Sequence, residues 1–179
     1  MRPLFFFFFV LSLCCRLSSA KEIVLKEQPY NDSPWPLNEV KFVVEKDALS
    51  AFAIFIAFEY QQYYVPDLLK GEVVKDEGPG SIVVSYELKT PFFLPNATYQ
   101  TDHRLWRTES GEFRASWKMI ESNSMKESFG SVVFIPLGDS RSQVIYESFV
   151  WPDSAFAALA KPIAKSSLLD TMEAIKKCI

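Results

Sequence analysis

The feature that most constrains this chain is a series of segments, between residues 70 and 150, in which apolar and polar residues alternate. In 82–88, for example, Ile82, Val84 and Tyr86 alternate with mostly polar neighbours, which places the apolar side chains on one face of a strand. Short turns separate the segments, so consecutive strands are expected to pair antiparallel. The predicted strands are 70–75, 82–88, 98–108, 112–121, 126–136 and 143–150.

Helical patterns precede this region. A β-rich run over 40–44 is followed by Asp47, which is a suitable N-cap for a helix over 48–58. A second short helix over 59–66 would end at its proline, because proline lacks the backbone donor that continues a helix.

The C-terminal region is predicted to be a long helix. Asp153 can cap a first turn, and Pro162 can begin a new helical segment. A spacing of three or four residues then predicts one mainly apolar stripe, made of Phe156, Leu159, Ile163, Ser167, Leu168, Met172, Ile175 and Ile179.

Together these elements predict an α+β fold. A curved antiparallel sheet of about seven strands would wrap around the long C-terminal helix, with two short helices after the first strand. The apolar face of such a sheet must be covered. Because only one long helix is available to cover it, we expect a partly hollow interior.

This order of elements resembles the helix-grip fold of the START-like superfamily, also called the SRPBCC or polyketide-cyclase/lipid-transport group. Three stretches carry the resemblance beyond topology: 58–67, an acidic and aromatic segment that ends near a proline; 90–99, a segment rich in proline and aromatic residues; and 150–153, a turn before the last helix. The resemblance covers 39–178 and implies an interior site for a hydrophobic molecule or lipid.

The first residues have the order of a secretory signal peptide. Arg2 precedes an apolar core that starts at Leu4, and small residues end at Ala20. We therefore expect a signal peptide over 1–20, an extended lead-in over 21–38 and a START-like ligand-binding domain over 39–179, exported to the periplasm or secreted. The apolar core of about 12 residues is shorter than the roughly 20 that span a bilayer. The alternatives are a membrane anchor and a lipoprotein modified at Cys14.

Composition excludes several classes of partner and cofactor. The chain has 19 basic and 22 acidic residues, so its net charge is slightly negative and gives no overall attraction for nucleic acid. With one histidine, and with only Cys178 left once the signal is removed, we expect no metal site, no cofactor and no internal disulfide. Transient contact with a membrane is possible, and the oligomeric state stays open.

The candidate ligand-binding residues are those expected to point inward from the strands and the last helix. Trp117 with its neighbours on the same face would form an aromatic wall, although an ordinary core is an equal interpretation. The full set is Val84, Tyr86, Tyr99, His103, Leu105, Phe113, Trp117, Met119, Phe134, Tyr146 and Met172. No residue is assigned a catalytic role.

His103 is the only imidazole and is expected to share a face with Tyr99, Thr101 and Leu105. It could be a polar anchor or an acid-base group, but a hydrogen-bonded structural histidine is the favoured interpretation because no carboxylate shares its face. No nucleophile elbow is present.

Other polar features have simpler explanations. Arg104, Arg107 and Arg114 could bind an anionic headgroup, but pairing with Asp102 and Glu112 across the strands is the favoured interpretation. The tripeptide 96–98 is an N-glycosylation sequon.

The leading hypothesis is an exported, non-catalytic carrier or sensor for a hydrophobic, lipid-like ligand. The alternatives are a cyclase- or hydratase-type enzyme using the same cavity, and a non-catalytic interaction module with a filled core.

Overall fold

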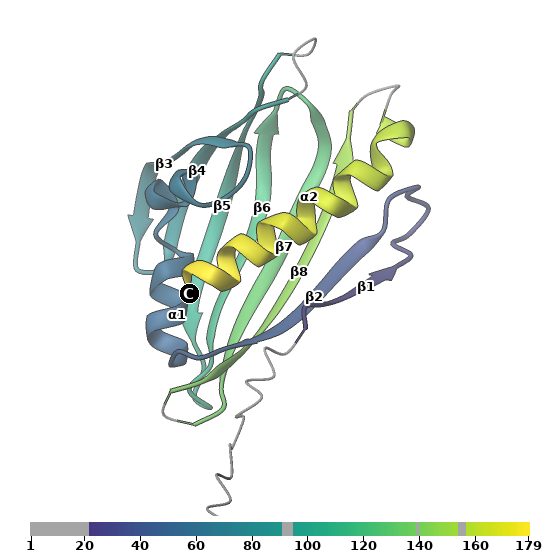
Figure 1. Cartoon of the computed structure of the whole chain (residues 1–179). Coiled ribbons are helices and arrows are strands. Elements are labelled where there is room, and N and C mark those ends of the chain that lie inside the picture. Colours follow the sequence, from purple (N-terminus) through teal and green to yellow (C-terminus); the bar gives the residue numbers. More distant parts are fainter. Residues whose placement is uncertain (1–21, 91–94, 139, 154–156) are drawn as a thin grey trace, which may run out of the picture.

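The computed structural model describes residues 22–90, 95–138, 140–153 and 157–179. Within these residues, eight antiparallel strands form one curved sheet, with neighbours in the order β1-β2-β8-β7-β6-β5-β4-β3. The strands are β1 (Val24–Gln28), β2 (Leu37–Val44), β3 (Leu68–Gly78), β4 (Ser81–Leu88), β5 (Ala97–Arg107), β6 (Phe113–Ser122), β7 (Met125–Pro136) and β8 (Ser142–Pro152). The long helix α2 (Ala157–Cys178) crosses one face of the sheet diagonally (Figure 1). This architecture confirms the predicted α+β class.

Two short elements join β2 to β3. Helix α1 (Ala48–Phe55) begins at Asp47, whose side chain accepts a hydrogen bond of 2.9 Å from the backbone N–H of Ser50, as the N-cap prediction requires. The segment η1 (Phe58–Tyr63) follows as a 3₁₀ helix. The predicted helix over 48–58 is therefore too long, because α1 ends at Phe55 and the separate 3₁₀ segment starts at Phe58.

The strand count of about seven is one too low, because β1 lies inside the predicted extended lead-in over 21–38. Its five residues pair antiparallel with β2. Proline-interrupted sequence hides so short an edge strand, and β2 itself starts at Leu37, also inside that lead-in. The predicted 70–75 strand is likewise only the middle of β3.

Helix α2 begins before Pro162 and continues through it, so the prediction of a new helix at this proline is wrong. A proline near the start of a helix removes one backbone donor, and the remaining turns form around it. Phe156 and the side chains of Leu159 and Ile163 lie outside the described part of the chain, as does the predicted signal peptide. Over the described residues, no helix has the length and hydropathy needed to cross a bilayer.

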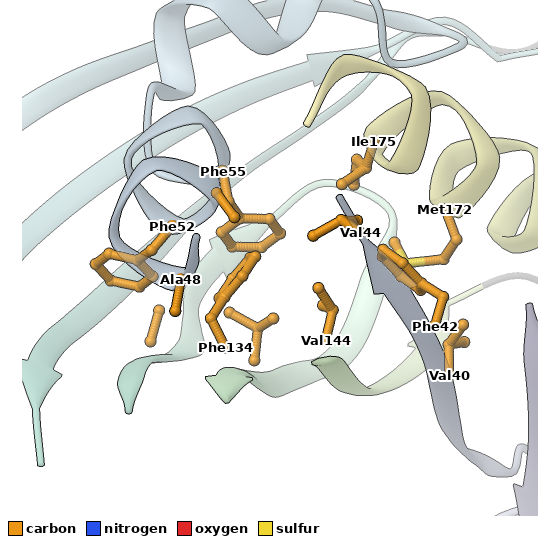
Figure 2. Packing of buried hydrophobic residues seen from close by; sticks show 13 residues of the cluster. Val40, Phe42, Val44, Ala48, Phe52, Phe55, Phe134, Val144, Met172 and Ile175 are labelled. Carbon is orange, nitrogen blue, oxygen red and sulfur yellow. The ribbon is translucent and has the colours of Figure 1, made fainter. Parts of the chain in front are cut away.

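The main core lies between the sheet, α1 and the C-terminal half of α2 (Figure 2). Phe52 and Phe55 of α1 pack against Phe134 of β7, with ring centres 5.8 and 5.7 Å apart. Met172 and Ile175 of α2 enter the same cluster. We call the sheet face that these helices cover the inner face.

The N-terminal half of α2 is attached to the β1–β2 hairpin by polar contacts. Lys165 pairs with Glu27 at 2.7 Å. Lys161 donates to the carbonyl of Pro34 and lies 5.5 Å from the centre of the Trp35 ring. The hairpin that the sequence did not predict therefore helps to hold the covering helix in place.

One turn requires glycine for a steric reason. Gly80, in the β3–β4 turn, has φ of 76° and accepts a 2.7 Å hydrogen bond from the N–H of Leu105. A Cβ atom at Gly80 would lie 2.2 Å from the carbonyl oxygen of Leu105. The turn can pack on β5 only because this side chain is absent.

Candidate functional site: an aromatic cluster on the inner face

Strand register sets which side chains meet on the inner face. A row of paired residues crosses it in the order Ile82, His103, Trp117, Gly130 and Ser148, from β4 to β8. Directly opposed residues of antiparallel strands point to the same face. This row therefore brings together residues from 82 to 148 of the sequence.

The structure places all ten predicted sheet residues on the inner face, and Met172 points at it from α2. They form two groups. Val84, Phe134 and Met172 are almost fully buried members of the packed core, and Phe113 and Leu105 pack against that core. We define the other group as the aromatic cluster: Tyr86, Tyr99, His103, Trp117 and Tyr146, with Met119 beside it.

The aromatic cluster is continuous. Tyr86 stacks on Tyr99 with ring centres 5.0 Å apart, and Trp117 lies 5.3 Å from Tyr146 and 6.1 Å from His103. Trp117, Tyr99, Tyr146 and Met119 are half-buried, unlike the packed core. Tyr86 and His103, by contrast, are buried, with 9% and 4% of their surface exposed.

His103 lies at the centre of the cluster and is only 4% exposed. Its Nε2 atom lies 2.8 Å from the hydroxyl oxygen of Thr101. Its Nδ1 atom is buried and has no hydrogen-bond partner among the described residues. Burial disfavours the protonated imidazole and lowers the pKa of His103 to about 4, so the ring is neutral at pH 7.

The tyrosines of the cluster are also desolvated. Burial raises the pKa of Tyr146 to about 12, and a hydrogen bond with Ser148 opposes part of that shift. Burial likewise raises the pKa of Tyr86 and Tyr99 well above the ordinary tyrosine value. All three phenols are therefore neutral, and they keep this region free of charge.

Gly130 positions Trp117. A Cβ atom at Gly130 would lie 2.2 Å from Cζ2 of the indole and 2.4 Å from the carbonyl oxygen of Glu147. The indole therefore occupies the volume that a side chain on β7 would take. Its orientation depends on a glycine in the neighbouring strand.

The candidate set omitted four residues of the site, namely Phe58, Thr101, Gly130 and Ser148. Thr101 was expected on the same face as His103 from the alternation of its strand, but it was not counted among the ligand-binding residues. The ring centre of Phe58 lies 4.7 Å from that of His103. Because the predicted helix over 48–58 ends at Phe58, the sequence did not predict that Phe58 starts η1 and points inward. Nothing in the sequence pairs Gly130 with Trp117.

Asp102 and Arg104 alternate with the inner-face residues of β5 and point away from the cluster, whereas Arg107 pairs with Phe113 on the inner face. Arg104 pairs with Asp102 at 3.1 Å, and Arg114 pairs with Glu112 at 2.8 Å. The predicted partners are therefore found, but each pair joins residues two positions apart in the chain instead of crossing between strands as expected. Arg107 lies 5.3 Å from the centre of the Phe113 ring. In the described part of the chain, no three His, Cys, Asp or Glu residues are grouped so as to hold a metal ion.

Two hollows open on the surface away from the cluster. One, of about 580 Å³, lies at the C-terminal end of α2 and is lined by Tyr64, Pro66, Asp170, Glu173, Ala174, Lys177 and Cys178. The other, of about 360 Å³, lies outside η1 and β3. None of the eleven predicted ligand-binding residues lines either of them.

Comparison with solved structures identifies the architecture. The chain resembles a STAR-related lipid transfer protein from Xanthomonas axonopodis, with a TM-score of 0.77, 13% identity, and 88% of this chain and 93% of that chain covered. For human StAR-related lipid transfer protein 5 the TM-score is 0.72 at 10% identity, with 92% and 88% covered. For the Zhui aromatase/cyclase from Streptomyces sp. R1128 it is 0.65 at 12% identity, with 79% and 91% covered.

At the level of sequence, no family model matches the chain, and none of the curated proteins matches it significantly. The three-dimensional likeness nevertheless confirms the resemblance drawn from the order of elements: the chain has the helix-grip fold of START domains and polyketide aromatase/cyclases.

Proposed function

We propose that this protein binds a hydrophobic, lipid-like molecule on the inner face of its sheet, beneath α2, and carries or senses it without chemical change. The observation that carries the proposal is that Tyr99, Trp117 and Tyr146 of the aromatic cluster are only half-buried. Tyr99 and Tyr146 are deep enough for burial to raise their pKa, yet parts of their side chains remain accessible. We infer that this accessible surface borders space inside the domain.

An apolar ligand would gain free energy by covering that surface. Each Å² of apolar surface removed from water contributes about 25 cal/mol. The packed core lies beside the cluster on the same face of the sheet. Concave, mainly apolar sites with a few polar groups are typical of small-molecule binding.

The solved structures of similar fold support this proposal by analogy alone, because one fold hosts many functions. Their names include both lipid transfer proteins and an aromatase/cyclase. For an enzyme of the second kind, His103 would be the candidate general acid. A pKa of about 4 leaves its ring unprotonated at neutral pH, which favours binding over general-acid chemistry.

The proposal is tested by ligand binding to delipidated protein. Native mass spectrometry of the purified protein, and thermal shift with oleate, cholesterol or phosphatidylcholine, should reveal a bound mass or a raised melting temperature. Absence of both with all three compounds would refute the carrier function and favour an interaction module.

A matched pair of variants locates the site. Met119 is half-buried on the inner face, whereas its neighbour Ile120 is 55% exposed. Met119→Lys should weaken binding at least tenfold, because an ammonium group beside an apolar ligand must be desolvated. Ile120→Lys should leave binding unchanged. Equal effects of the two variants would place the ligand elsewhere.

We further propose that the protein acts after export, as the composition of residues 1–20 indicates. Expression of the full chain followed by mass spectrometry of the exported product should give an N-terminus at Lys21. A product that begins at a lipid-modified Cys14 would instead support the lipoprotein alternative, and an uncleaved chain would refute processing.

A further inference from the structure

His103 is a polar group surrounded by rings. The centres of the Phe58, Trp117 and Tyr86 rings lie 4.7, 6.1 and 6.4 Å from that of the imidazole. The neighbouring inner-face residues on β4, β5 and β6, from Tyr99 to Leu105 along β5, carry no charge, and the first charged one, Arg107, lies beyond Leu105 over the Phe113 ring. A ligand in this part of the site would therefore meet aromatic surface and one imidazole.

One nitrogen atom of the imidazole is hydrogen-bonded, and the other has no partner among the described residues. Nε2 is paired with the hydroxyl of Thr101 at 2.8 Å. Nδ1 is buried without a partner among the described residues. Buried polar atoms are nearly always paired, because an unpaired one loses its hydration without compensation. An oxygen atom of a ligand at Nδ1 would remove this penalty, whereas a hydrocarbon could not.

Depending on its tautomer, His103 can form a hydrogen bond with a carbonyl or with a hydroxyl oxygen of a ligand. If the threonine hydroxyl donates to Nε2, then Nδ1 carries the proton and can donate to a carbonyl. If Nε2 donates to the threonine oxygen, Nδ1 can accept from a hydroxyl. In both states the ring is uncharged, so it offers no ion pair to a carboxylate or a phosphate.

We propose that His103 Nδ1 is the contact that selects the ligand, and that the preferred ligands are neutral apolar molecules carrying a hydroxyl or carbonyl oxygen. This inference rests on the proposed function, since it names the class of ligand for the same site. The Phe58 ring, whose centre lies 4.7 Å from that of the imidazole, is carried by the short η1, whereas Tyr86 and Trp117 are held in the sheet.

Three fluorescent probes of nearly equal size test the selection: 1-pyrenemethanol, 1-methylpyrene and 1-pyrenecarboxylate. Dissociation constants are measured by fluorescence titration at pH 7 for the wild-type protein and for His103→Phe. The wild-type protein should bind the alcohol about tenfold more tightly than the methyl compound, as one added hydrogen bond predicts. The carboxylate should bind most weakly.

His103→Phe keeps an aromatic ring and removes both nitrogens. It should bind 1-methylpyrene within about twofold of the wild-type protein, which also shows that the variant is folded, and should lose the preference for the alcohol. His103→Gln, which retains a donor and an acceptor, should keep part of that preference.

Different outcomes separate this inference from the proposed function. Three results would overturn only the selection by His103 and leave the proposed function standing. These are equal binding of the alcohol and the methyl compound by the wild-type protein, strongest binding of the carboxylate, and a preference for the alcohol that persists in His103→Phe. Failure of all three probes to bind the wild-type protein would overturn the apolar site itself, and with it this inference.

Discussion

Replacement of Gly130 by alanine should destabilise the protein through a clash that the structure defines on two sides. The new Cβ atom would lie 2.2 Å from the Trp117 indole and 2.4 Å from the carbonyl oxygen of Glu147. The indole can rotate, but the carbonyl belongs to the neighbouring strand β8 and cannot move without disturbing the ladder that pairs Gly130 with Ser148.

Insertion of one carbon into a packed interior typically costs about 1–3 kcal/mol. Since one of the two obstacles is backbone, we expect Gly130→Ala to lose about 3 kcal/mol, the upper end of that range. For a domain of this size, this corresponds to a fall in melting temperature of roughly 6–12 °C. Displacement of Trp117 should also change the near-UV circular dichroism and the tryptophan fluorescence.

Urea unfolding of four variants measures the effect. Ser131→Ala, on the opposite face one residue along β7, is the control and should change stability by less than about 0.5 kcal/mol. A double-mutant cycle combines Gly130→Ala with Trp117→Leu. Removal of the indole should recover only part of the loss, because the Glu147 carbonyl remains in place. A loss below about 1 kcal/mol for Gly130→Ala, or complete recovery in the double mutant, would refute this reasoning.

Two further predictions concern pH and the covering helix. The pKa of His103 is about 4 in the folded protein, against a reference value of 6.5. Between these two pH values the unfolded state binds more protons than the folded state. The free energy of unfolding should therefore fall as the pH falls through this window, by up to about 3 kcal/mol. Urea unfolding at pH 7.0, 5.5 and 4.5 should show a smaller fall for His103→Gln, and parallel curves would contradict the assignment. Met172 is 1% exposed, so Met172→Ala should lower the free energy of unfolding by about 2–5 kcal/mol, measured by thermal or urea unfolding. A near-neutral result would mean that the packing of α2 does not depend on this contact.

The site could be predicted from the sequence as far as strand alternation reaches. His103 was predicted to share its face with Tyr99, Thr101 and Leu105, and the register places these four on the inner face. Alternation works here because side chains of one strand point to opposite faces in turn. It could not separate the packed residues, such as Phe134, from the half-buried ones, such as Trp117, because burial depends on what lies across the face.

The errors in the fold have local causes. The strand β1 is short and lies at the edge of the sheet, and edge strands of five residues carry little periodicity. Phe58 was assigned to the wrong element because apolar residues are compatible with the α and 3₁₀ geometries alike. Pro162 was read as a helix start, although the surrounding turns extend the helix across it.

By itself, the sequence determined the α+β class, the long C-terminal helix and the inward face of each main strand, since these depend on periodicities within one segment. Only the tertiary structure decided that the β1–β2 hairpin holds α2, that Phe58 covers His103 and that Gly130 makes room for Trp117. Each of these pairings joins residues that are distant in sequence or lie on different elements, and their meeting depends on register, sheet curvature and the path of the helix. A pattern within a single segment carries no information about any of these three.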